Sequence, residues 1–194
     1  MKKIVIIFSL AILAKNTVCA QTSRTDSTQI RSTIMSFYNW YIKNQSKINS
    51  FELYKGTKSS DTPPYKINWP EVNKYFAFIR SSVPWLGEAY IANQKKFFQE
   101  CDSAFKADPE GEIPYGFDFD WYTNSQEDAG WLVDELKNAT QWVTTVNGMD
   151  ATVDVLGFYN DNGKQVETVI LCYAMKKEKG KWKIARISCP YSKY

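Results

Sequence analysis

The side chains best suited to chemistry gather in one acidic and aromatic segment, residues 108–138. It holds nine acids, six aromatic residues and a single base, Lys137. Clustered carboxylates raise one another's pKa, so one of them can stay protonated near neutral pH and act as an acid. From this segment and from an aromatic stripe further upstream, we select the candidate binding residues Asp118, Asp120, Trp121, Tyr122, Gln126, Asp128, Tyr38 and Trp40.

Calcium binding is one interpretation of this segment. Asp118, Asp120 and Asn124 carry oxygen atoms of the kind that calcium prefers. An EF-hand loop, however, requires a third ligand where Tyr122 stands and a glycine where Thr123 stands. We therefore predict neither a metal site nor a cofactor site.

Two further interpretations of the segment stay open. It can form an aromatic-lined pocket or partner surface in which the acids supply specificity. Alternatively, its Asp and Ser side chains cap turns and a short helix near 126–137, while the aromatic residues close the core. A connection of this length inside a small domain is more often functional than not, which keeps a binding role among the expectations.

The chain contains no histidine. This absence excludes histidine general bases, Ser-His and Cys-His nucleophiles, and the commonest zinc ligands. Acid–base chemistry would have to use Asp, Glu, Lys or Tyr. The enzymatic alternative is therefore a proton-transfer enzyme of the isomerase type, with an Asp base and a Tyr hydrogen-bond donor in a cone-shaped apolar pocket.

Cys172 and Cys189 form a candidate disulfide because they fall on strands that we predict to be adjacent and antiparallel. The bridge would close a loop of about 16 residues and would stabilise the fold by about 3 kcal/mol. Buried reduced thiols are the alternative, since an oxidising compartment permits a bridge without requiring one. Cys101 is the third cysteine of the predicted mature chain, so at most one internal bridge forms.

The N-terminus has the three-part pattern of a secretory signal. Two lysines precede an apolar run over residues 4–14, and small side chains lead up to Ala20. We therefore divide the chain into a signal peptide, residues 1–20, and one α+β domain, residues 21–194.

The mature domain is predicted to be periplasmic or secreted and not an integral membrane protein. Lipid anchoring through Cys19 is disfavoured because lipoprotein signals place a small residue where Val18 stands. No other apolar stretch approaches the roughly 20 residues of a membrane helix.

The chain carries 24 Lys+Arg against 21 Asp+Glu, and three of these cations precede residue 21. The mature domain is formally neutral, which gives no support to nucleic-acid binding.

Apolar periodicity predicts three N-terminal helices packed on one face of a curved antiparallel sheet of about four strands. The first helix is expected over about 26–44, and residues 45–67 are predicted to form a loop. A second helix should start at a cap on Asn68 with Glu71 as its partner, and a third should run from Pro84 to about 106. Alternating runs predict strands near 142–146, 151–159, 165–177 and 182–189.

Helices followed by such a meander resemble the nuclear-transport-factor-2-like, or cystatin-like, superfamily. Within it the chain is similar to a group of bacterial envelope proteins classed as a domain of unknown function. The motifs that carry the resemblance are aromatic and acidic, here Phe37-Tyr38-Asn39-Trp40-Tyr41, Asp118-Phe119-Asp120 and Ser125-Gln126-Glu127-Asp128. The resemblance spans most of residues 28–190 and implies a cone-shaped fold and an envelope compartment, but no reaction. Catalytic histidines of superfamily enzymes have no counterpart here.

We expect an exported binding module whose site lies near 118–128 and the first helix. Its partner would be a small ligand or another envelope protein. The proton-transfer enzyme is the alternative function. A group of five lysines around the last hairpin is either a solvated turn or a docking patch for an anionic surface; these are Lys176, Lys177, Lys179, Lys181 and Lys183.

Overall fold

The computed structural model describes residues 24–56, 62–111 and 114–188 of the chain. The predicted signal peptide, residues 1–20, lies outside the described residues, and so does Cys189 of the candidate disulfide. No described helix is both long enough and apolar enough to cross a membrane.

Four helices form in the described part of the chain, because each places its apolar side chains on one face. They are α1 (Arg24–Ile48), α2 (Trp69–Ser82), α3 (Glu88–Ala107) and α4 (Ala129–Asn138). The stripe of α1 is fully buried and heavily aromatic, as the spacing predicts, and consists of Ile30, Ile34, Phe37, Tyr38 and Tyr41.

Residues 45–67 are predicted to form a loop with little regular structure, and the structure adds a helix end and two short strands to this stretch. α1 continues through Ile48, and two short strands pair antiparallel within this stretch. These strands are β1 (Tyr54–Lys55) and β2 (Lys66–Ile67). Two-residue strands carry too little periodicity to be recognised in a sequence.

The predicted start of α2 after Asn68 is confirmed, but its capping contacts and the predicted start of α3 differ from the structure. Asn68 precedes α2, but its side chain makes no capping hydrogen bond, and Glu71 pairs with Lys74 instead. α3 begins at Glu88 rather than at Pro84. The intervening backbone is held against a distant strand, since the Ile184 N–H donates to the Trp85 carbonyl at 2.8 Å. This pairing keeps residues 84–87 out of the helix.

The predicted meander is confirmed as a four-stranded antiparallel sheet in the order β3-β4-β5-β6. Alternate side chains of the strands are buried on one face of the sheet. The strands are β3 (Gln141–Asn147), β4 (Asp150–Asp161), β5 (Lys164–Glu178) and β6 (Lys181–Ser188).

A register shift in the last hairpin affects the cysteine prediction. Lys179 and Gly180 form a two-residue turn with positive φ at both positions, and Glu178 then pairs with Lys181. A bulge between Ala174 and Met175 moves the pairing by one residue, so Cys172 lies opposite Ser188. The candidate disulfide to Cys189 stays a prediction because that residue is outside the described range.

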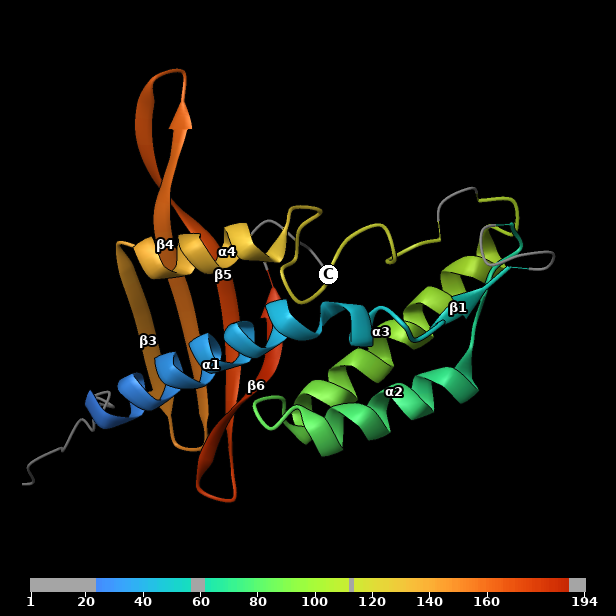
Figure 1. Ribbon diagram of the computed structural model, residues 1–194, viewed down its shortest axis with the longest axis horizontal. Coiled ribbons are helices and arrows are strands. Elements are labelled where there is room, and N and C mark those ends of the chain that lie inside the picture. Colours follow the sequence, from blue (N-terminus) through green and yellow to red (C-terminus); the bar gives the residue numbers. More distant parts are fainter. Residues whose placement is uncertain (1–23, 57–61, 112–113, 189–194) are drawn as a thin grey trace, which may run out of the picture.

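The elements form two layers, which confirms the α+β class. α1 and α4 contact one another and cross the sheet, while α3 contacts β6 near the start of the helix and then runs away from the sheet (Figure 1). α2 and α3 extend to the side of the sheet, and the connection from α3 to α4 passes back between these two groups of helices (Figure 1). This connection contains the acidic and aromatic segment, and it brings the segment close to the core.

Candidate functional site

Asp120 lies at the centre of a turn that the connection makes before α4. Its carboxylate accepts a hydrogen bond from the Tyr41 hydroxyl at 2.5 Å and from the Tyr122 backbone N–H at 2.8 Å. The Asp120 N–H donates to the Ser125 carbonyl at 2.9 Å, which closes the turn. Burial raises the pKa of the Asp120 carboxyl, while the hydrogen bonds from Tyr41 and Tyr122 act in the opposite direction.

Tyr122 extends from this turn into a cluster of buried tyrosines. Its hydroxyl forms a short hydrogen bond with that of Tyr75, and its carbonyl accepts from the Tyr38 hydroxyl at 2.7 Å. Tyr173 donates to Tyr38 at 3.2 Å. Burial raises the pKa of Tyr75 to about 12, so the cluster stays protonated and neutral. Tyr38 and Tyr122 are therefore core residues that join the turn to α1 and the sheet.

The other candidate residues of the segment have local structural contacts. The Gln126 amide donates to the Asp118 carbonyl at 2.9 Å. Asp128 caps α4 by accepting from the Gly130 N–H at 2.7 Å. These contacts, like those of Asp120, agree with the capping interpretation of the segment. Trp40 on α1 packs against the rings of Phe78 and Trp85.

A groove of about 770 Å³ lies between α3, residues 108–111 and 115–124, and the end of β6; we call it the α3–β6 groove. Of the predicted site residues, Asp118 and Trp121 line it. Seven aromatic residues contribute to its wall, and Trp121 packs against the ring of Phe97. The aromatic lining residues are Tyr65, Tyr90, Phe97, Phe105, Tyr115, Phe119 and Trp121.

Gln94 is a buried polar residue on this wall that sequence analysis missed. Its side chain is only 7% exposed, and its Nε2 atom is buried without a hydrogen-bond partner. Gln94 falls four residues after Tyr90 and four before Phe98, on the buried face of α3. A polar residue in the middle of an apolar stripe was the signal in the sequence. A buried amide nitrogen needs an acceptor, and a ligand in the groove can supply one if the Gln94 side chain turns toward it.

The charged residues of the groove leave a small excess of acid. Lys96 and Glu100 both belong to α3 and pair at 3.7 Å, so they largely offset one another. The remaining charged residues are two acids, Asp108 and Asp118, and one cation, Arg186 of β6. The groove is therefore suited to an apolar ligand with a modest positive charge.

The enzymatic alternative requires a carboxylate inside an apolar cavity. Asp120 is largely buried and has a raised pKa, but it does not line the α3–β6 groove, and both its oxygens accept hydrogen bonds from the protein. Its geometry gives no observation in favour of a proton-transfer reaction. Within the described ranges, no group of three or more Cys, Asp or Glu side chains is placed to hold a metal ion.

Several of the hairpin lysines make contacts within the protein. Lys176 pairs with Asp150 at 3.1 Å, and Lys177 pairs with Asp26 of α1 at 2.9 Å. The Lys183 ammonium forms a short hydrogen bond to the Pro84 carbonyl. These contacts favour a structural role for this part of the lysine group.

Comparisons with known proteins give no family. No protein-family model matches the chain, and no curated protein is similar to it. One solved structure resembles it, described as the type VI native effector-immunity complex Tae3-Tai3 from Ralstonia pickettii. The match has a TM-score of 0.36 and 15% identity, and it covers 84% of this chain and 95% of that one. A likeness this low carries no argument about function, and the resemblance to the nuclear-transport-factor-2-like superfamily stays a prediction.

Proposed function

We propose that the chain is an exported binding module that holds its ligand in the α3–β6 groove. The observation that carries the proposal is the buried Gln94 Nε2 atom, which has no partner on the groove wall. Leaving such a donor unpaired costs about 1–3 kcal/mol. A ligand with an acceptor oxygen would remove this cost on binding.

The composition of the groove wall supports the same proposal. Ligand sites are concave, mostly apolar and aromatic, and contain a few polar groups that fix orientation. The α3–β6 groove combines aromatic rings with Gln94, Asn124 and the carboxylate of Asp118. Export to the periplasm or the cell surface rests on the N-terminal signal pattern, and there the partner would be a small ligand or another envelope protein.

The test is to fill the groove without disturbing the rest of the fold. Ala104 lies on the α3 wall, and Ala104→Trp places a large ring in the groove. We expect ligand-observed NMR with a fragment library to find compounds that bind the wild-type protein and lose binding to Ala104→Trp.

The matched control is Ala92→Trp, because Ala92 is exposed on the same helix and does not line the groove. This variant should bind the same fragments as the wild type. Fragments that bind Ala104→Trp as well as the wild type, or a library without any binder, would contradict the proposal.

A further inference from the structure

We propose that the α3–β6 groove binds an extended, basic and apolar segment of another polypeptide, which adds as a strand to the outer edge of β6. This inference rests on the proposed function and names the ligand class of the same groove. Pairing with a sheet edge supplies main-chain hydrogen bonds, and a neighbouring groove supplies pockets for alternate side chains.

The first argument is the state of the β6 edge. β6 is the last strand of the sheet, so its outer side faces away from β5. At Ile184 the backbone groups on this side already have hydrogen-bond partners. The Ile184 N–H donates to the Trp85 carbonyl, and the Ile184 carbonyl accepts from the Gly87 N–H at 3.1 Å. The Ala185 carbonyl accepts from the Asn93 side chain at 2.9 Å. The outer edge therefore already forms an isolated bridge with Leu86 of this chain.

Beyond Ala185 the edge opens into the groove. α3 diverges from β6 along its length (Figure 1), and residues 185–187 line the groove together with α3. Among the described residues, no strand pairs with the outer side of β6 over 186–188. An edge strand presents backbone N–H and C=O groups at regular intervals, which is a template for another strand.

The second argument is Gln94, which lines the groove together with residues 185–187 of β6. An added strand pairs with β6 on one side and directs its other N–H and C=O groups toward α3. A rotation of the Gln94 side chain would let its buried Nε2 atom donate to one of these carbonyls, and this contact would give a main-chain acceptor to a nitrogen that otherwise has none. Aromatic rings on the wall, among them Phe97 and Trp121, receive the apolar side chains.

The third argument is charge. Lys96 and Glu100 offset one another as an ion pair. The two carboxylates of Asp108 and Asp118 then outnumber the one remaining cation on the wall, Arg186. The connection that forms this wall also carries Glu110. Basic side chains on the incoming strand complement these acids, whereas acidic side chains are repelled.

The experiment uses a labelled octapeptide of alternating leucine and lysine, titrated with the purified protein and followed by fluorescence polarisation. The first matched probe replaces every lysine by glutamate. Two further probes are methylated on the backbone nitrogens, one at the leucines and one at the lysines. In an extended peptide these two sets of N–H groups point to opposite edges, and only one edge faces β6.

We expect the leucine–lysine peptide to bind the wild type and the Ala92→Trp variant, and to lose binding to Ala104→Trp. The glutamate analogue and one of the two methylated analogues should each bind about tenfold more weakly, while the other methylated analogue binds nearly as well as the parent. No binding of the parent peptide, equal binding of the two methylated analogues, or full binding to Ala104→Trp overturns the inference. If fragments bind in the groove but the peptide does not, strand addition is wrong and the binding-module proposal stands.

Discussion

At the scale of single residues, two effects act in opposite directions on the pKa of Asp120. Burial disfavours its charged form, while hydrogen bonds from Tyr41 and the Tyr122 N–H favour it, and the net effect is a raised pKa. A carboxyl with a raised pKa in the folded state binds a proton more readily there than in the unfolded chain. Its contribution to stability is therefore present below the unfolded pKa of about 3.9 and is lost as the pH rises through the folded pKa.

This linkage gives a prediction for Asp120→Asn, which cannot ionise. The free energy of unfolding of the wild type, measured relative to Asp120→Asn, should fall as the pH rises from about 4 through the raised pKa of Asp120. Urea unfolding of both proteins over a series of pH values measures this difference. A difference that is constant or that rises with pH would mean that the hydrogen bonds outweigh burial and that the pKa is not raised.

Residue types alone identified the acidic and aromatic segment as a candidate site. They did not show which of its side chains line the groove. Asp118 and Trp121 line the groove, whereas Tyr122 and Tyr38 are almost completely buried. The difference follows from the path of the chain around Asp120, which is closed by contacts with Tyr41 on a helix far away in sequence. Long-range contacts of this kind leave no local pattern in a sequence.

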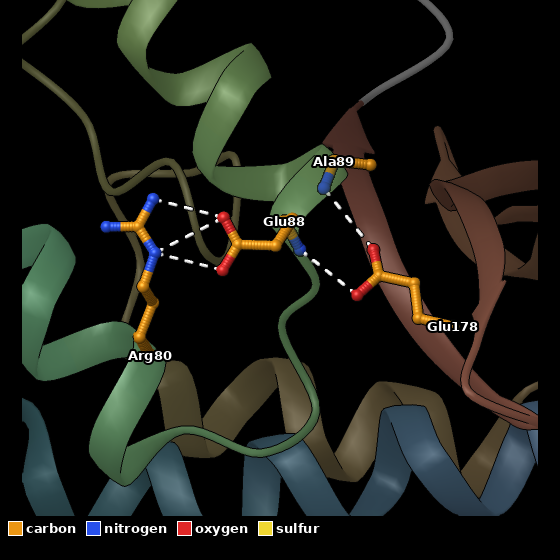
Figure 2. A network of polar contacts seen from close by, with 4 residues as sticks. All are labelled: Arg80, Glu88, Ala89 and Glu178. Atoms are coloured by element: carbon orange, nitrogen blue, oxygen red, sulfur yellow. Dashed lines mark hydrogen bonds and ion pairs between the residues drawn. The ribbon is translucent and has the colours of Figure 1, made fainter.

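At the scale of elements, the start of α3 depends on a carboxylate from the last hairpin. Glu178 of β5 accepts hydrogen bonds from the backbone N–H groups of Glu88 at 3.2 Å and of Ala89 at 3.4 Å (Figure 2). The Glu88 side chain pairs in turn with Arg80 of α2 at 2.9 Å (Figure 2). Gly87 makes this approach feasible, since a Cβ atom there would collide with the Glu178 carboxylate. The carboxylate stabilises the helix N-terminus and links α3 to the sheet.

Removing this cap should cost measurable stability. We expect Glu178→Ala to lower the free energy of unfolding by about 1 kcal/mol, because it leaves two N–H groups at the start of α3 without their acceptor. The comparison is Glu127→Ala, which removes an exposed glutamate elsewhere and should change stability by less than about 0.5 kcal/mol. Equal effects of the two substitutions in urea unfolding would show that Glu178 does not cap α3.

The strands and the helix faces could be predicted because each depends on its own periodicity. The buried stripe of α1 and the alternation of Val153 and Val155 in β4 are examples. The start of α3 could not be predicted, because the pairing of Trp85 with Ile184 joins residues far apart in the chain. β1 and β2 were missed because two residues give no period.

At the scale of the whole molecule, the groove exists only where separate parts of the chain meet, and three of them supply most of its wall. α3 supplies Gln94 and Phe97, the connection before α4 supplies Trp121, and β6 supplies residues 185–187. None of these parts forms the site by itself. Sequence analysis therefore identified only the part of the site that belongs to the acidic and aromatic segment. Gln94 is the residue on which the account of the groove depends, because its amide nitrogen is buried without a hydrogen-bond partner.

The most direct test measures stability and binding together in Gln94→Leu. Leucine fills a similar volume without the buried donor, so the free energy of unfolding of the unliganded protein should stay the same or rise by about 1 kcal/mol. Affinity for the fragments that occupy the wild-type groove should fall about tenfold, because their acceptor loses its donor. The account would be contradicted if Gln94→Leu unfolded more easily while binding those fragments as tightly as the wild type, since Gln94 would then serve the fold and not a ligand.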